Sequence, residues 1–311
     1  MNGSASSSHR LWLRIVLTLA WGVPSMGLAC ACGCGVFDVG VGSMFVTHGG
    51  LEVFLEEDFL DQDRNWSGTQ SAPAEDNPDK RIRSFFTTVG LQYLFDRSWS
   101  ATIEIPYWER QFATTLTDGS IGTFNHGALG DIRVKGAYTG LSADLSTGIT
   151  FGVKLPTGDS SYPHFDPDTE IGSGSTDLLL GAYHLGKVTT DNRWSWFADA
   201  QWQQPLVHEA AYRPGAELDA AAGVYYGGWT LGATRLTPIV QLDLTYRRHD
   251  GGPAGDALDT GYARGFASPG LEVDTGRARL YVAVALPVYT NVSGNQLVAN
   301  VLFKLNAAWR F

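Results

Sequence analysis

Three cysteines in one short stretch are the residues of this chain best suited to metal or covalent chemistry. Cys30, Cys32 and Cys34 stand in the run CACGCG, and the 311-residue chain contains no other cysteine. Thiolates at this spacing suit a soft metal such as Cu(I). Lipidation of Cys30 and an oxidised or mixed-disulfide segment are the alternatives. Because the count is odd, at least one sulfur needs a partner outside the cluster.

The segment before the cysteines has the pattern of an export signal. Arg10 and Arg14 supply positive charge, the neighbouring residues are mostly apolar, and the small residues Gly27 and Ala29 stand where a signal peptidase would cut. We therefore expect residues 1–29 to be a signal peptide. Residues 30–48 would then be a cysteine-containing periplasmic segment, whose later part either adds a periplasmic strand or occludes the domain that follows. No CxxCH haem site occurs, and no cofactor is expected.

The end of the chain is a strand with one apolar and one polar face. Residues 298–311 alternate between the two kinds of side chain and finish on the aromatic Phe311. An extended chain alternates in this way when one face meets hydrocarbon and the other meets water. The ending looks like the C-terminal aromatic signal of outer-membrane β-barrels. It predicts two partners, the outer-membrane lipid and the barrel assembly machinery.

Composition favours a barrel over a helical enzyme. Charged residues make up 17% of the chain and aromatic residues 12%, and the mean hydropathy is −0.09. An apolar outside and a polar inside cancel to such a near-neutral mean. After position 30 no apolar run reaches the roughly 20 residues of a spanning helix. The net charge of −10 argues against nucleic-acid binding.

The connections between the expected strands are sorted by length. Short turns are expected near 96–98, 140–144, 227–230 and 274–276, and they alternate with longer polar loops near 63–80, 114–125, 157–172, 205–214 and 249–260. A soluble sandwich has no reason for this sorting, whereas an outer-membrane barrel places short turns in the periplasm and long loops outside. The sequence therefore predicts an all-β, membrane-spanning, antiparallel up-and-down barrel of about 12 strands over residues 49–311, located in the bacterial outer membrane.

Two glycine-rich segments carry a family resemblance. They are GALGDIRVKGAY at 127–138 and GSGSTDLLLGAYH at 172–184, and KLPTGD at 154–159 precedes the second. This arrangement resembles the outer-membrane family named after the MetA pathway of phenol degradation. The resemblance implies an outer-membrane channel or transporter. The family name does not identify phenols as the solute.

Charged side chains opposite the apolar faces are the candidate pore-lining residues. They are Glu56, Asp58, Glu104, Asp131, Arg133, Lys135, Lys154, Asp177, Asp199, Asp243, Arg247, Lys304 and Arg310. Acid and base are mixed, and charges inside a narrow barrel tend to pair with one another. We expect a narrow polar path for small solutes, and a plugged, non-conducting interior is the alternative. The last strand should close the barrel by pairing its Lys304 and Arg310 with acids of the first strand.

Other functions are weighed against the channel. A non-conducting scaffold would present the cysteines to a metal or to a periplasmic partner. An outer-membrane lipase would need a serine beside a histidine. His126 and His184 are the candidate histidines, and neither has an obvious serine at a fixed spacing, so no enzyme is expected. The acidic loop at 157–172 is compatible with Ca²⁺ but lacks the glycine of an EF-type turn.

Overall fold

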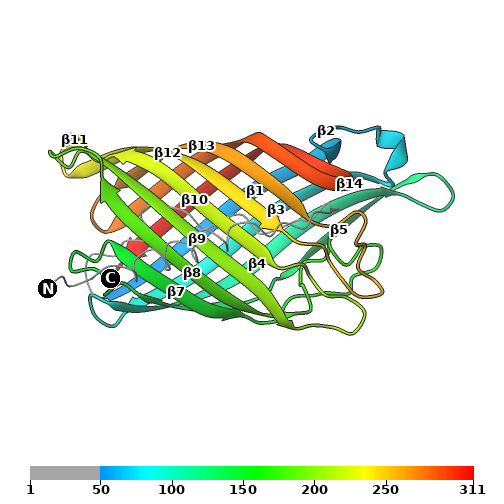
Figure 1. Ribbon diagram of the computed structural model, residues 1–311, viewed down its shortest axis with the longest axis horizontal. Helices are drawn as coiled ribbons and strands as arrows, with labels where there is room; N and C mark the ends of the chain where they lie inside the picture. Colours follow the sequence, from blue (N-terminus) through cyan, green and yellow to red (C-terminus); the bar gives the residue numbers. More distant parts are fainter. Residues whose placement is uncertain (1–49) are drawn as a thin grey trace, which may run out of the picture.

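The computed structural model describes residues 50–311, which form a barrel of antiparallel strands (Figure 1). The predicted signal peptide, the periplasmic segment and the cysteines Cys30, Cys32 and Cys34 lie outside the described residues and stay predictions. The elements are β1 (Gly50–Gly68), β2 (Gln70–Ser71), the 3₁₀ turn η1 (Ala74–Asp76), β3 (Asp79–Leu94), β4 (Trp99–Thr115), β5 (Ile121–Leu129), β6 (Arg133–Tyr138), β7 (Thr147–Lys154), β8 (Thr176–Lys187), β9 (Trp194–Val207), β10 (Glu217–Tyr226), β11 (Trp229–Leu231), β12 (Thr234–Arg247), β13 (Tyr262–Asp274) and β14 (Ala278–Arg310).

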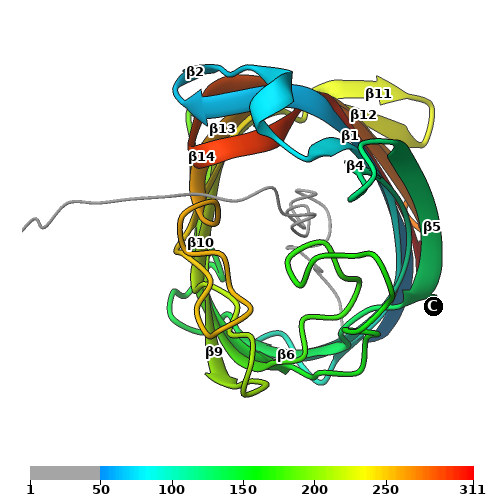
Figure 2. The ribbon, with the colours of Figure 1, turned by 90° about the vertical axis from the view of Figure 1, so that its right-hand side faces the viewer.

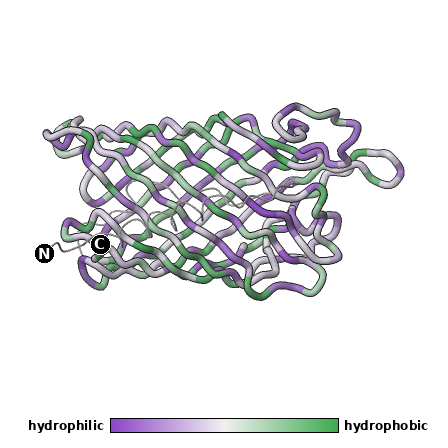
Figure 3. Tube along the Cα trace, in the orientation of Figure 1, coloured by the Kyte–Doolittle hydropathy of each residue, from purple (hydrophilic) through white to green (hydrophobic). Residues whose placement is uncertain are grey.

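Side-chain alternation explains why these segments form a closed wall. Along β1, Glu52, Glu56 and Asp58 are buried on the inside, while Leu51 and Leu55 face outward and are exposed. A strand points successive side chains to opposite faces, so each strand sorts its own residues between lumen and lipid. Hydrophobic and hydrophilic residues accordingly alternate along the tube in Figure 3.

The strands form a closed ring in which most neighbours are also consecutive along the chain. Each barrel strand pairs with its neighbours, β1 pairs with β14, and β10 pairs with β12, so eleven strands make a ring without a free edge. The prediction of a closed antiparallel membrane barrel is confirmed. β5 and β6 are consecutive parts of one pass through the wall, because both pair with β4.

The longest strand, β14, crosses the wall twice. Its 33 residues would extend about 110 Å if straight. Its first half pairs with β13 and its second half with β1, and the Arg310 N–H donates to the Arg277 carbonyl at 2.9 Å. The chain therefore folds back, at Gly294, whose φ of +59° suits a tight turn. Counting β14 twice gives twelve passes, as the sequence predicts.

The two ends of the barrel carry connections of different length. Short turns at 95–98 and 275–277 lie at the end where β1 starts and β14 finishes, and the long connections 155–175 and 248–261 lie at the other end. Figure 1 shows this sorting along the long axis of the barrel. The predicted separation of short turns from long loops is confirmed.

Two segments differ from the sequence reading. Ile121–Leu129 was expected to be mostly loop but forms β5, because it pairs residue by residue with an extended β4. The sequence pattern of β13 indicates a strand only over Leu271–Asp274, yet the strand begins at Tyr262. Its first part, YARGFASPG, contains glycine and proline and lacks a clear alternation, so the pattern underestimates it.

Exposed and half-buried aromatic rings gather at two levels of the outer wall. Near the short turns, Trp99 packs against Tyr138 with ring centroids 4.7 Å apart. At a higher level, Phe59 lies between Phe85 at 4.6 Å and Phe303 at 6.4 Å. Such rings suit the two headgroup regions of a bilayer. Separately, none of the helical turns within residues 50–311 is long and apolar enough to cross a membrane.

Candidate functional site

The inside of the seam between β1 and β14 is held by ion pairs. The Glu52 carboxylate lies 3.0 Å from Arg310 Nε and 2.7 Å from Arg279 Nη2. Lys304 Nζ lies 3.5 Å from Glu56 and 3.8 Å from Asp58. The prediction that the closing strand pairs with the first strand through complementary charge is therefore confirmed.

A second ion-pair cluster joins β7, β8 and the connection between β5 and β6. Lys154 Nζ lies 2.7 Å from Asp177 and 3.5 Å from Asp131, and it donates to Ser173 Oγ at 2.6 Å. Asp177 also accepts hydrogen bonds from Ser175 and from Gln203, each 2.6 Å long. Buried charges are stable only when paired and hydrogen-bonded in this manner.

The loop between β7 and β8 turns into the mouth of the barrel, where Figure 2 shows it in green. Asp131 fixes both of its ends by accepting hydrogen bonds from the backbone N–H groups of Gly158 (3.0 Å) and Ser173 (2.9 Å). The buried Arg110 guanidinium donates to the carbonyls of Thr169 and Glu170, in the middle of the loop. The loop is thus anchored to the wall at several points.

The glycine-rich segments of the family resemblance meet at this anchor. A Cβ atom on Gly172 would lie 2.3 Å from the carbonyl carbon of Gly158, closer than any real contact, so the two loop ends cross only as glycines. Gly158 belongs to KLPTGD and Gly172 to GSGSTDLLLGAYH, and Asp131, which binds both loop ends, belongs to GALGDIRVKGAY. The sequence identified the three segments, but their spacing along the chain did not reveal that they converge.

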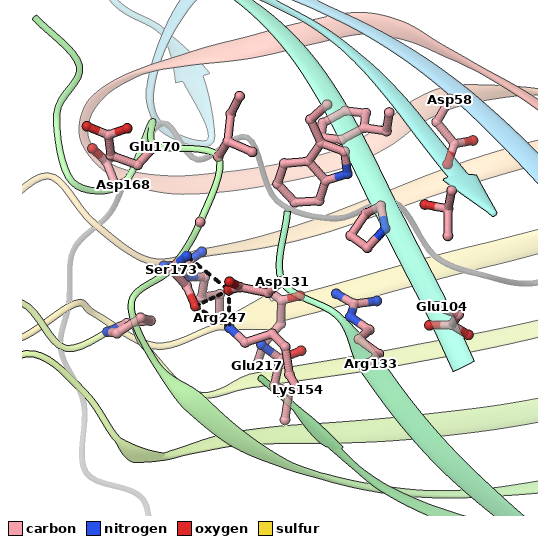
Figure 4. Close-up of a pocket in the computed structure, with 18 of the residues that line it drawn as sticks. Asp58, Glu104, Asp131, Arg133, Lys154, Asp168, Glu170, Ser173, Glu217 and Arg247 are labelled. Atoms are coloured by element: carbon pink, nitrogen blue, oxygen red, sulfur yellow. Dashed lines mark hydrogen bonds and ion pairs between the residues drawn. The ribbon is translucent and has the colours of Figure 1, made fainter. Parts of the chain in front are cut away.

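These groups surround a chamber in the lumen. The chamber has an empty volume of about 1100 Å³, part of it open to solvent, between the wall and the inward loop. In Figure 4 the loop residues Asp168 and Glu170 lie on one side of it, with Glu104 and Asp58 across from them. Its charged lining consists of seven carboxylates (Glu56, Asp58, Glu104, Asp131, Asp168, Glu170 and Glu217) and three cations (Arg133, Lys154 and Arg247).

One carboxyl on the loop is a weaker acid than usual. Burial raises the pKa of Glu170 to about 7, and the charges of Asp159 and Asp166 add to the effect. The Tyr162 backbone N–H and the Arg110 guanidinium act against it by lowering the pKa. Near neutral pH the charge of this loop therefore depends on pH.

A second chamber lies beside β12, β13 and β14 and has a more apolar wall. Leu60, Phe266, Ala285 and Leu302 line it, together with Lys304. The ion pair from Lys304 to Asp58 connects the linings of the two chambers, because Asp58 belongs to the first. The sequence reading anticipated a polar lumen and did not find this apolar part.

Every predicted pore-lining residue lies in a strand or beside one of the chambers, and none is exposed. Those buried are Glu56, Asp58, Glu104, Asp131, Lys154, Asp177, Asp243 and Lys304; those half-buried are Arg133, Lys135, Asp199, Arg247 and Arg310. Lys135 forms an ion pair with Glu104, and Arg247 pairs with Asp250 at 2.8 Å. Lys135, Asp177, Asp199 and Arg310 do not line either chamber. Ser173 and Arg264 carry no sequence signal, because loops and irregular strands have no alternation, and Glu170 stands out only as part of the acidic loop. Arg110 lies in the regular strand β4, but its contacts with the loop leave no local pattern.

The two histidines considered for catalysis have other partners. His126 Nε2 lies 3.0 Å from Asp159, and its ring stacks on Tyr162 with centroids 3.8 Å apart. His184 Nδ1 lies 2.7 Å from the Thr147 hydroxyl. Within the part of the chain that the structure describes, neither ring forms a hydrogen bond with a serine. Residues 50–311 also contain no group of three His, Cys, Asp or Glu side chains able to hold a metal.

Sequence comparison finds no relative for the chain: no family model matches it, and no curated protein does. Solved structures are similar in fold. An outer-membrane channel from Pseudomonas putida F1 has a TM-score of 0.66 at 11% identity, covering 86% of this chain and 97% of that chain. The β domain of the Bordetella autotransporter BrkA has a TM-score of 0.50 at 11% identity, covering 85% and 100%. The monoaromatic hydrocarbon channel CymD reaches 0.47 at 10% identity, covering 92% and 95%. At these identities the likeness concerns the fold: the chain is a β-barrel of the outer-membrane type.

Proposed function

We propose that this protein is a channel of the bacterial outer membrane that lets small solutes pass through its lumen. The carrying observation is the pair of adjoining chambers inside a closed barrel, with charged side chains along their linings. A purely structural interior would be packed without such space. The Pseudomonas putida structure, which is itself described as an outer-membrane channel, supports this proposal.

The charge of the first chamber sets the expected preference. Seven carboxylates against three cations leave an acidic lining, although Lys135 pairs with one of these acids and Lys304 with two. Field lines concentrate in a narrow path with low-dielectric walls, so small cations should be favoured over small anions. The predicted pore-lining residues would act in this way through their summed charge.

Location and assembly follow from the same proposal. Residues 1–29 would direct export, and the terminal strand, which ends beside the start of β1, would be read by the barrel assembly machinery. The exposed aromatic rings would contact lipid headgroups. We expect no enzymatic activity, since neither His126 nor His184 is placed beside a serine.

Proteoliposome swelling tests the proposal. The purified full-length protein, refolded and reconstituted, should accelerate swelling in small uncharged solutes such as arabinose relative to protein-free vesicles. The rate should fall steeply as the solute grows to a disaccharide and beyond. Equal swelling with and without protein would contradict transport. A heat-denatured sample is the control for leakage caused by the protein preparation.

A further inference from the structure

Arg264 on β13 is a buried guanidinium whose Nε and Nη2 have no hydrogen-bond partner. Its side chain is 9% exposed, and its contact is with the Tyr262 ring, 3.8 Å below the guanidinium carbon. Other buried arginines donate to carbonyls or carboxylates, as Arg110 and Arg279 do, although Arg279 Nη1 also lacks a hydrogen-bond partner. A buried charge without a partner is costly, so it needs an explanation such as a ligand that is bound in use.

The neighbouring charges are already engaged. Asp243 lines the same chamber, but its carboxylate accepts hydrogen bonds from Ser268 and Gln241 and lies beyond ion-pair distance of Arg264. Lys304, at the far side, pairs with two acids of β1. Within residues 50–311, therefore, no carboxylate neutralises Arg264.

The chamber beside Arg264 offers both apolar surface and hydroxyl groups. Its empty volume is about 800 Å³, part of it open to solvent, and its wall includes Phe266, Ala283 and Leu302. Thr245 and Thr290 flank Arg264 on β12 and β14 in the strand register. The Arg264 guanidinium is thus a charged group in the wall of a largely apolar pocket.

We propose that this pocket binds a small apolar carboxylate. The planar guanidinium would take the carboxylate in a two-point contact, which an ammonium group cannot offer. Tyr262 supports the guanidinium plane from below, and its own hydroxyl is engaged with Glu217 at 3.2 Å. The hydrocarbon part of the ligand would cover the wall at Phe266 and Leu302. If such carboxylates are the solutes that the channel carries, this part of the inference rests on the proposed function.

Direct binding tests the site independently of transport. Calorimetry on the full-length protein in detergent should show saturable binding of benzoate and hexanoate. The uncharged amides, benzamide and hexanamide, should bind at least about tenfold more weakly, because a charge-assisted contact is lost. Arg264→Gln should weaken benzoate binding by a similar factor. Arg97→Gln, in an exposed turn, is the matched control and should leave binding unchanged.

Each result decides the matter. Arg264→Gln removes an unpaired buried charge, so it should fold at least as well as the parent, and heat-modifiable mobility on gels checks this. No benzoate binding, equal binding of acid and amide, or unchanged binding by Arg264→Gln would each overturn the site. If binding fails while proteoliposomes still swell, the site is lost and the channel stands. If the protein binds benzoate but does not accelerate swelling, the binding site stands and the channel proposal is contradicted.

Discussion

Arg310 Nε lies 3.0 Å from the Glu52 carboxylate, so an ion pair joins the last strand to the first across 258 residues of chain. Glu52 is 1% exposed and also accepts from Arg279. One carboxylate thus holds two arginines on β14 at the point where the barrel closes.

Glu52→Gln should destabilise the barrel. The amide cannot neutralise Arg279 and Arg310, and breaking a buried pair costs about 3 to 5 kcal/mol of unfolding free energy. Urea unfolding in lipid vesicles, followed by tryptophan fluorescence, measures the change. Glu75→Gln, in the exposed turn η1, is the control and should change stability by less than about 0.5 kcal/mol. A Glu52→Gln barrel as stable as the parent would show that the seam does not depend on this charge.

Gly172→Ala should displace the inward loop. The new methyl group would collide with the Gly158 backbone, and overpacking of this kind costs about 1 to 3 kcal/mol. Limited proteolysis of the folded protein should then cut within 157–172 faster than in the parent. Gly227→Ala, where a Cβ meets nothing within 4 Å, is the control. Unchanged cleavage in the Gly172 variant would mean that the loop is not held at this crossing.

Loop docking should weaken as pH rises from about 5 to 8. The pKa of Glu170 is raised to about 7 in the folded loop from an ordinary value of 4.5. A raised pKa means that the folded state binds the proton more tightly. The proton on Glu170 therefore stabilises the docked loop fully below pH 4.5, and this stabilisation is lost as the pH rises through about 7. The effect is at most about 3 kcal/mol.

Hydrogen exchange of the Gly158 and Ser173 amides, corrected for intrinsic pH dependence, measures this docking because both amides bond to Asp131. Protection should fall with rising pH in the parent and stay level in Glu170→Gln. Parallel pH profiles in the two proteins would assign the dependence to another group.

Regular strands could be read from the sequence, and the reasons are physical. Where one face meets lipid, as for Leu51 and Leu55, alternation is enforced and the strand is visible. The charge pairing of Lys304 and Arg310 with β1 followed from the same alternation. The irregular start of β13 hid Arg264, and the crossing of Gly158 and Gly172 depends on a long loop folding inward. Contacts between segments distant in sequence leave no local period.

Single-channel recording in planar bilayers tests the central claim most directly. We predict that the full-length protein, or a variant lacking residues 30–48, produces discrete conductance steps. In a salt gradient the reversal potential should indicate that K⁺ passes more readily than Cl⁻, because carboxylates outnumber cations seven to three along the first chamber. Refolded barrels of both proteins that show no conductance would contradict the channel.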